Sequence, residues 1–414
     1  MNASKVSASD SKMPRVIVAG GSVAGLSAAI FLSEAGCDVD VYERSQRPLE
    51  GRGAGIVCHP TIFGVLGCDP TDITAQVMVL RYLDSQGDIF SEAACNYRFI
   101  AYATLHKVLM DRIDSAQYHL GSEVVSFLEV GEEVQVKLSD GTVMAADLLV
   151  CADGIHSSSR RQLLPGTEPK YAGYVGWRGI LTADQMGSET YSMFADSVVY
   201  SVPPNSHALI YPILNVDTAA GAELLINWVW YRNVEEGPLL DQLLTDSSGA
   251  RRPFSLAAGE VSAEKIAELV AEAQRTLPPQ IAELVTNTKE PFVQVISDID
   301  VPSMAFGRIA LIGDAAFAVR PHIAVGTAKA IEDAWTLVNA VTESPDEIAE
   351  ALRKWEVAQL ALGHAAASRA RLAGHRSQVE NSWQLGEALP YGLYESGDSL
   401  LDWDSLKTQI GGKK

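Results

Sequence analysis

Glycines, an acidic residue and a helix start lie close together near the N-terminus. Residues 20–25 read Gly-Gly-Ser-Val-Ala-Gly after the apolar run Val16–Ala19, and Glu43 ends a second apolar run. In such a unit, glycines let the backbone approach phosphates and a helix N-terminus supplies free N–H groups, while the acid binds a ribose hydroxyl. The stretch therefore predicts a strand–turn–helix–strand unit that binds a dinucleotide pyrophosphate. Ser22 stands where a second glycine is usual, and an ordinary glycine turn is the alternative.

Two later turns also follow apolar runs. The first begins with Asp153-Gly154 and continues to Arg160, and the second is Gly313-Asp314. An aspartate at a strand end can accept hydrogen bonds from a ribityl hydroxyl. A helix that begins near Gly326 can direct N–H groups at the pyrimidine edge of an isoalloxazine, where reduction places negative charge. A dehydrogenase needs only the first turn, so three turns in this order predict FAD.

Composition narrows the class of protein. The 414 residues suffice for two domains, and a net charge of −20 argues against nucleic acid or an anionic membrane as partner. No apolar run reaches the roughly 18 residues of a membrane span, and the polar start indicates no secretory signal. The five cysteines are scattered, without metal-ligand spacing. We therefore expect a cytoplasmic enzyme with reduced thiols and no metal.

The hydrophobic pattern predicts the elements that position these turns. From Tyr171 onward, aromatic segments with period-two alternation indicate an antiparallel sheet, and helices are expected over Ala263–Thr276, Pro279–Asn287, Thr327–Val341 and Pro345–Arg371. The predicted fold is α/β: a Rossmann-like FAD-binding domain interrupted by an antiparallel-sheet substrate domain, with C-terminal helices. The predicted bounds are a flexible tail (1–13), the FAD-binding domain (14–74, 104–170 and 292–345), the substrate domain (75–103 and 171–291) and a C-terminal helical segment (346–414).

The motifs together resemble the FAD-dependent aromatic hydroxylases, which are single-component flavoprotein monooxygenases. The likeness covers residues 14 to about 345. The family motif D-G-x-x-S-x-x-R is complete at Asp153–Arg160, and G-D is matched by Gly313-Asp314. The chain departs from the family pattern in three motifs: Phe317 replaces a usual histidine, Tyr102 replaces a usual arginine, and P-x-x-G-Q-G is matched only at Pro321 and Gly326. The segments Tyr171–Gly179 and Ile210–Ile213 are similar to hydroxylases of dihydroxypyridines within this family.

The resemblance implies a reaction. NADH or NADPH reduces FAD, O₂ adds to give a flavin C4a-hydroperoxide, and an electron-rich hydroxylated aromatic or N-heteroaromatic ring attacks it, with a dihydroxypyridine as the expected substrate. It also suggests a homodimer. One alternative is a flavin-dependent halogenase or reductase of the same fold, although Trp228-Val-Trp230 lacks the Ile-Pro that follows in halogenases. The other is a non-catalytic FAD-binding protein.

Site residues follow from the motifs and from the resemblance. His59, Tyr211 and His322 are the catalytic candidates, and each histidine has a structural role as its alternative. Trp177, Arg178, Asn227, Trp230 and Tyr231 are the substrate-binding candidates. Core packing is the alternative for the tryptophans, while Arg178 could instead bind a nicotinamide-nucleotide phosphate or form a salt bridge. The expected FAD contacts are Gly20, Ser22, Val23, Ala24, Gly25, Glu43, Arg44, Gly55, Ile56, Tyr102, Asp153, Gly154, Arg160, Gly313, Asp314, Pro321, Gly326 and Thr327.

Overall fold

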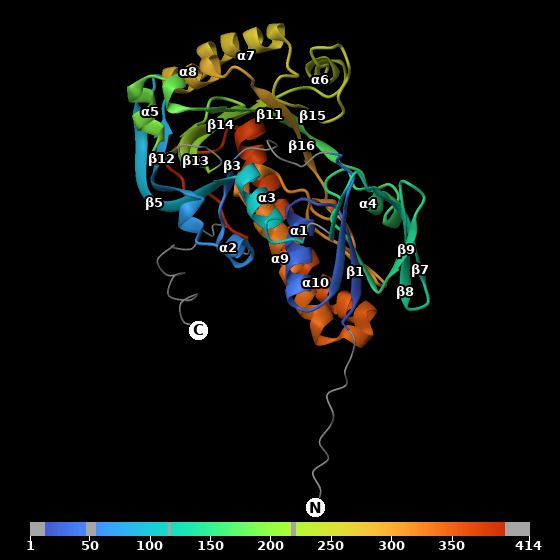
Figure 1. The fold of residues 1–414 in the computed structure, drawn as a ribbon. Coiled ribbons are helices and arrows are strands. Elements are labelled where there is room, and N and C mark those ends of the chain that lie inside the picture. The colour runs from blue at the N-terminus through green and yellow to red at the C-terminus, as the bar shows by residue number, and fades with distance from the viewer. Residues whose placement is uncertain (1–12, 47–54, 115–116, 217–220, 394–414) are drawn as a thin grey trace, which may run out of the picture.

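The computed structural model describes residues 13–46, 55–114, 117–216 and 221–393 (Figure 1). Nearly all of the predicted N-terminal tail and the last part of the predicted C-terminal segment lie outside these residues. Within them, no helix is both long and apolar enough to cross a bilayer, and the five cysteines are free thiols. No group of side chains there could hold a metal ion.

A six-stranded sheet brings the three motif strands side by side. All of its strands are parallel except β17, which is antiparallel to β18. In spatial order they are β17 (Ala305–Phe306), β18 (Ile309–Leu311), β10 (Leu148–Cys151), β1 (Arg15–Ala19), β2 (Asp38–Glu43) and β6 (Tyr118–Leu120). The carboxyl ends of parallel strands meet at one edge of a sheet. The turns after β1, β10 and β18 therefore meet at one edge, as the FAD interpretation requires.

Helices pack against this sheet and bury its apolar side chains. Leu26, Ile30 and Leu32 of α1 are almost fully buried in the same core as Val16–Val18 of β1. In Figure 1, α1, α9 and α10 run close together through the middle of the molecule. The main helices here are α1 (Val23–Glu34), α2 (Pro60–Leu66), α3 (Tyr102–Met110), α9 (Gly326–Glu343) and α10 (Ile348–His375). The predicted pair of long C-terminal helices is thus confirmed.

A nine-stranded sheet forms the other half of the molecule. It is antiparallel apart from the β12–β4 pair, and confirms the sheet predicted from Tyr171 onward. In spatial order its strands are β15 (Ser255–Leu256), β16 (Phe292–Asp298), β11 (Lys170–Leu181), β14 (Glu223–Asn233), β13 (Ser206–Asn215), β12 (Ser197–Ser201), β4 (Ala75–Leu83), β5 (Ile89–Ala101) and β3 (Gly55–Val57). Strands β3 and β16 both belong to this sheet, although their residues fall within the predicted FAD-binding segments. The domain bounds stay a prediction.

Smaller elements complete the fold. A separate three-stranded sheet consists of β7 (Val124–Val130), β8 (Glu133–Leu138) and β9 (Val143–Ala146). The remaining helices are α4 (Ser158–Leu163), α5 (Ser188–Phe194), α6 (Pro238–Leu243), α7 (Ala263–Thr276) and α8 (Pro279–Asn287). Helices α7 and α8 lie over one face of the nine-stranded sheet (Figure 1), and their apolar side chains share a core with that face. The other face of the nine-stranded sheet is not covered by these two helices.

Candidate active site

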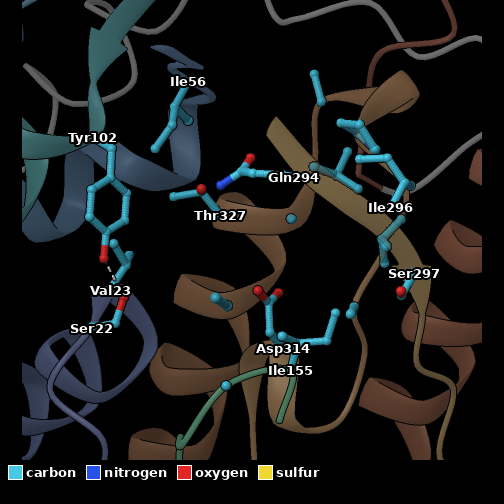
Figure 2. Close-up of a pocket in the computed structure, with 18 of the residues that line it drawn as sticks. Ser22, Val23, Ile56, Tyr102, Ile155, Gln294, Ile296, Ser297, Asp314 and Thr327 are labelled. Carbon is cyan, nitrogen blue, oxygen red and sulfur yellow. Dashed lines mark hydrogen bonds between the residues drawn. The ribbon is translucent and has the colours of Figure 1, made fainter. Parts of the chain in front are cut away.

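A cavity of about 720 Å³ lies between the motif edge of the six-stranded sheet and the free face of the nine-stranded sheet. Asp314, Thr327 and Gln294 come from different elements and point into this space (Figure 2). The predicted residues that line it are Ser22, Val23, Ala24, Arg44, Gly55, Ile56, Tyr102, Gly154, Arg178, Tyr211, Tyr231, Asp314, Pro321, Gly326 and Thr327. The fold therefore gathers most of the predicted FAD contacts, and part of the substrate set, around one cavity.

The first glycine turn is built by close backbone approaches. Gly20 has a positive φ of 109°, and a Cβ on Gly25 would lie 1.9 Å from the carbonyl oxygen of Gly20. Only glycine fits position 25, because helix α1 starts directly on top of the turn. The buried Glu43 carboxylate accepts hydrogen bonds from the backbone N–H groups of Gly21 and Ser45, both at 2.8 Å. Glu43 thus holds the turn, and its bond to a ribose stays a prediction.

Two helix N-termini reach the same cavity. Neither Ser22 nor Val325, the N-cap residues of α1 and α9, forms a side-chain capping bond. Ser22 Oγ instead shares a 2.6 Å hydrogen bond with the hydroxyl of Tyr102 (Figure 2). The first N–H groups of both helices are therefore left for a ligand, and the positive helix ends favour negative charge there. The pyrophosphate and the reduced flavin ring of FAD are two such groups, so the cavity fits FAD.

The second turn is held by residues behind the cavity wall. Asp153 accepts hydrogen bonds from Ser157 Oγ at 2.5 Å and from the Ser159 backbone at 3.0 Å. Arg160 is fully buried and donates to the carbonyl oxygens of Ile155 (2.6 Å), Thr167 (3.1 Å) and Ala315 (2.9 Å). Burial lowers the pKa of Arg160. Because Ile155 and Ala315 belong to different motifs, Arg160 ties the second turn to the third.

The third turn presents a carboxylate to the cavity. Asp314 faces this space from below in Figure 2, and its side chain is exposed to the cavity. The protein around the cavity raises the pKa of this carboxyl to about 6. The turn is fixed by Asp333, which accepts the Gly313 N–H at 3.1 Å and pairs with the buried Lys329. No other described residue hydrogen-bonds to the Asp314 side chain, so its oxygens are available to hydroxyl donors of a ligand.

The opposite wall comes from strands β11, β13 and β14. Arg178, Tyr211 and Tyr231 line the cavity from three adjacent strands. Tyr211 donates its hydroxyl to the carbonyl oxygen of Gly55 at 2.6 Å, and the Asn227 side chain accepts the Gly55 N–H at 3.4 Å. Burial raises the pKa of both tyrosines, and the positive charge of Arg178 opposes this effect. Two buried nitrogens, Arg178 Nε and Asn227 Nδ2, have no hydrogen-bond partner among the described residues.

The tryptophans lie on the other face of this sheet. Trp177, Trp228 and Trp230 are almost fully buried in the core under α7 and α8. Trp228 donates its indole N–H to Thr288 at 2.9 Å, and Trp230 donates to Ser206 at 2.7 Å. Successive side chains alternate between the two faces of a strand. Because Arg178 and Tyr231 point into the cavity, the adjacent Trp177 and Trp230 point away from it. The placement of Trp177 and Trp230 in the substrate site does not agree with the structure, and core packing is their role.

The two histidine candidates stand behind the cavity wall rather than on it. His322 is buried, and its Nε2 shares a 2.6 Å hydrogen bond with the Tyr174 hydroxyl. Its ring centre lies 5.0 Å from that of Tyr231. Burial, with the nearby His207 and Arg320, lowers the pKa of His322 well below its usual value, so it is neutral at pH 7. His59 is buried just after β3. Their catalytic roles stay predictions.

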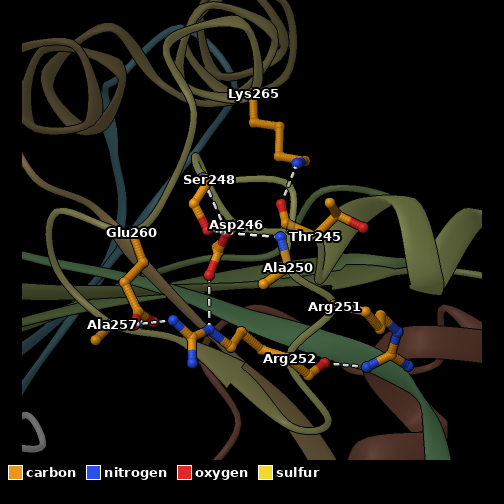
Figure 3. A network of polar contacts seen from close by, with 9 residues as sticks. All are labelled: Thr245, Asp246, Ser248, Ala250, Arg251, Arg252, Ala257, Glu260 and Lys265. Atoms are coloured by element: carbon orange, nitrogen blue, oxygen red, sulfur yellow. Dashed lines mark hydrogen bonds and ion pairs between the residues drawn. The ribbon is translucent and has the colours of Figure 1, made fainter.

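One further wall comes from residues that the sequence motifs did not indicate. Phe254 and Ser255 line the cavity beside Gln294 of β16. The loop that carries them is held by Asp246, which accepts hydrogen bonds from Ser248, Ala250 and Arg252 (Figure 3). Gln294 was detectable as a polar residue at an inner position of the apolar strand Phe292–Asp298. The loop offered no comparable signal, because its place depends on pairing between β15 and β16.

Comparison with known proteins assigns the family. The chain belongs to the FAD-dependent aromatic hydroxylases, because a member of that family is 37% identical to it over 384 residues. That relative is the 2,6-dihydroxypyridine 3-monooxygenase of Paenarthrobacter nicotinovorans, and the match covers 92% of this chain and 96% of the relative. The 6-hydroxynicotinate 3-monooxygenase of Pseudomonas fluorescens is 26% identical, with 80% and 84% covered. A family model described as FAD binding domain-like matches residues 171–298.

Solved structures agree with this assignment. The structure of 2,6-dihydroxypyridine-3-hydroxylase from Arthrobacter nicotinovorans superposes with a TM-score of 0.88 at 35% identity, covering 94% of this chain and 99% of that one. The predicted fold, the FAD cofactor and the monooxygenase class are thereby confirmed, with NAD(P)H as co-substrate. The comparisons do not favour the halogenase, reductase or non-catalytic alternatives.

Proposed function

We propose that this enzyme hydroxylates 2,6-dihydroxypyridine to 2,3,6-trihydroxypyridine. The observation that carries the proposal is the wall formed by Arg178, Tyr211 and Tyr231, which faces the three FAD-binding turns across one cavity. The relative that is 37% identical is named for this substrate and this ring position. In the overall reaction, O₂ gives one oxygen atom to the ring. Two electrons from NAD(P)H and two from the ring reduce O₂, and the other oxygen atom leaves as water.

The cavity's own side chains suit a small ring with ionisable hydroxyls. Arg178 supplies a positive charge and one buried N–H donor, at Nε, that has no partner among the described residues; both favour the ionised form of a ring hydroxyl. An ionised hydroxyl makes the ring electron-rich, as oxygen transfer requires. The phenols of Tyr211 and Tyr231 stay protonated because burial raises their pKa. Tyr231 is thus a hydrogen-bond donor for the second hydroxyl, while Tyr211 positions Gly55.

Apolar residues complete the substrate side. Val229, Ile296 and Leu209 line the cavity beside the polar groups, so a bound ring would displace water from them. When bound, FAD supplies the reducible ring that takes a hydride from NAD(P)H and activates O₂. A dry site prevents the loss of activated oxygen as H₂O₂. We assign Asp314 to the ribityl chain and the N-termini of α1 and α9 to the pyrophosphate and the pyrimidine edge. A homodimer is part of this proposal.

The test is NADH or NADPH oxidation by the purified FAD-loaded enzyme, with and without 2,6-dihydroxypyridine. Hydroxylated product and H₂O₂ are measured in the same reaction. We expect strong stimulation and little peroxide. Stimulation that yields mostly peroxide would show that this pyridine is only an effector, and would move the assignment to related phenols and hydroxypyridines. No stimulation by any hydroxylated ring would overturn the proposal.

A further inference from the structure

A second cavity of about 620 Å³ lies on the opposite face of strand β14. Its walls are the end of β14, the turn between β12 and β13, the end of β4 and the last turn of α7. Trp230 and Arg232 line this second cavity, whereas Tyr231 between them lines the first. The alternation of β14 therefore separates the two cavities, and the second one is no extension of the flavin site.

Arg232 is the unusual residue of this cavity. Its side chain is partly buried and forms no hydrogen bond or ion pair with any described residue. The guanidinium carbon lies 4.8 Å from the centre of the Trp230 ring, which fixes the stem of the side chain against the wall. Burial lowers the pKa of Arg232, the effect opposed by Glu272 and Glu268 and reinforced by Arg275. The guanidinium therefore has a ring contact on one side but no carboxylate partner among the described residues, and an anion in the cavity would supply that partner.

The other charges of the cavity are already engaged. Glu272 binds Arg275 with both carboxylate oxygens, at 2.5 and 3.1 Å, and its pKa is lowered mainly by this hydrogen bonding. One Asp84 oxygen accepts the backbone N–H groups of Gln86 and Asp88, at 2.9 and 3.0 Å. Both carboxylates line the cavity, and neither hydrogen-bonds to Arg232. Their negative charges repel a multiply charged anion more strongly than a singly charged one.

We propose that this cavity binds a small organic monocarboxylate, held by the guanidinium of Arg232. The planar fork of a guanidinium matches a carboxylate at two points. Leu83, Val202 and Pro203 supply an apolar surface for the rest of the ligand. The two acids of the cavity disfavour inorganic phosphate, a large fraction of which is the dianion at pH 7, and phosphate has no apolar part to contact Leu83, Val202 and Pro203.

The test is calorimetric titration of the FAD-loaded enzyme with benzoate, with benzamide as the uncharged control of the same shape. We expect benzoate to bind at least tenfold more tightly than benzamide or inorganic phosphate. Arg232→Met should weaken benzoate tenfold or more, and Arg232→Lys should weaken it less. Because benzoate also suits the first cavity, the titration is repeated in Arg178→Met, where the remaining benzoate binding should still depend on Arg232.

Several results would overturn the proposal. Benzoate affinity that is unchanged in Arg232→Met, or lost in Arg178→Met, would place the anion elsewhere. Equal affinity for benzoate and benzamide would show that no charge is recognised. Arg232→Met is expected to keep its FAD and its melting temperature, because Arg232 forms no hydrogen bond with the described protein. If Arg232→Met does not fold, unchanged affinity in Arg232→Lys together with equal binding of phosphate would reject a carboxylate fork.

Discussion

The two walls of the first cavity differ in how well the sequence predicted their lining residues. On the motif wall, Ser22, Gly154 and Asp314 line the cavity as their turns predicted. On the wall from the nine-stranded sheet, Arg178 and Tyr231 line the cavity, but Trp177 and Trp230 point away from it. A turn that follows a parallel strand always lies at the carboxyl edge of the sheet, whereas the side chain of a strand residue can point to either face of the sheet.

Adjacent residues of one strand therefore line different cavities and have different roles. On β14, Tyr231 faces the flavin side while Trp230 and Arg232 face the helix side and the second cavity. Substitutions of adjacent residues should therefore give different phenotypes. Substitutions in the motif turns should affect cofactor binding as a whole. The following predictions test this contrast in order of decreasing expected effect.

Gly25→Val should abolish FAD binding. The added side chain would occupy the space of the Gly20 carbonyl, since even a Cβ would lie 1.9 Å from that oxygen. The measurement is the flavin absorbance that copurifies with the protein. The control is Gly64→Ala in α2, where a Cβ meets no atom within 4 Å. Flavin content equal to wild type in Gly25→Val would contradict the close approach of α1 to the turn.

Arg178→Met should lower kcat/KM for 2,6-dihydroxypyridine by about 100-fold, the scale of a lost hydrogen bond between charged groups in a buried site. FAD content should be unchanged, because Arg178 stands on the sheet wall. Arg178→Lys keeps the charge and should recover part of the activity. Steady-state kinetics of substrate-dependent NAD(P)H oxidation provide the measurement. Full activity in the methionine variant would remove Arg178 from the substrate site.

Tyr231→Phe and Trp230→Phe form a matched pair on the two faces of β14. Tyr231→Phe should lower kcat/KM about tenfold through the loss of one hydrogen bond, with little change in stability. Trp230→Phe should keep kcat/KM within about twofold while costing about 1–3 kcal/mol of unfolding free energy, because it removes buried volume and the bond to Ser206. Denaturant unfolding and kinetics distinguish them. Exchanged phenotypes would reverse the assignment of the faces.

Asp314 should make the stability of the FAD-free protein fall with rising pH. Its pKa is about 6 in the folded protein against an ordinary value of 3.8, so the folded state holds the proton more tightly. This contribution is fully present below the ordinary value and is lost as pH rises through about 6. Asp314→Asn should remove the slope between these values. Denaturant midpoints of both proteins across this pH range test it, and parallel curves would contradict a raised pKa.

Much of the fold was predictable because its signals are local. The glycine turn with its flanking apolar runs predicted β1, α1 and β2, and the alternation after Tyr171 predicted the antiparallel sheet. The FAD-binding family was also indicated by sequence, since its motifs are turns whose residue types are set by backbone conformation. The sequence placed strand β16 in the FAD-binding segment, whereas the strand pairs within the nine-stranded sheet. The hydrophobic pattern of a strand does not indicate which strand it pairs with.

The sequence by itself determined the cofactor class, the order of the elements and the motif edge, because each follows from neighbouring residues. Only the tertiary structure decided which face of β14 meets the cavity, since that depends on where α7 and α8 pack. It also set His322 behind Tyr231 and brought Phe254 to the cavity through the pairing of β15 with β16. Arg178 and Arg232 lie in different cavities because their side chains point to opposite faces of the same sheet. These contacts join residues far apart in the chain, and no local pattern encodes them.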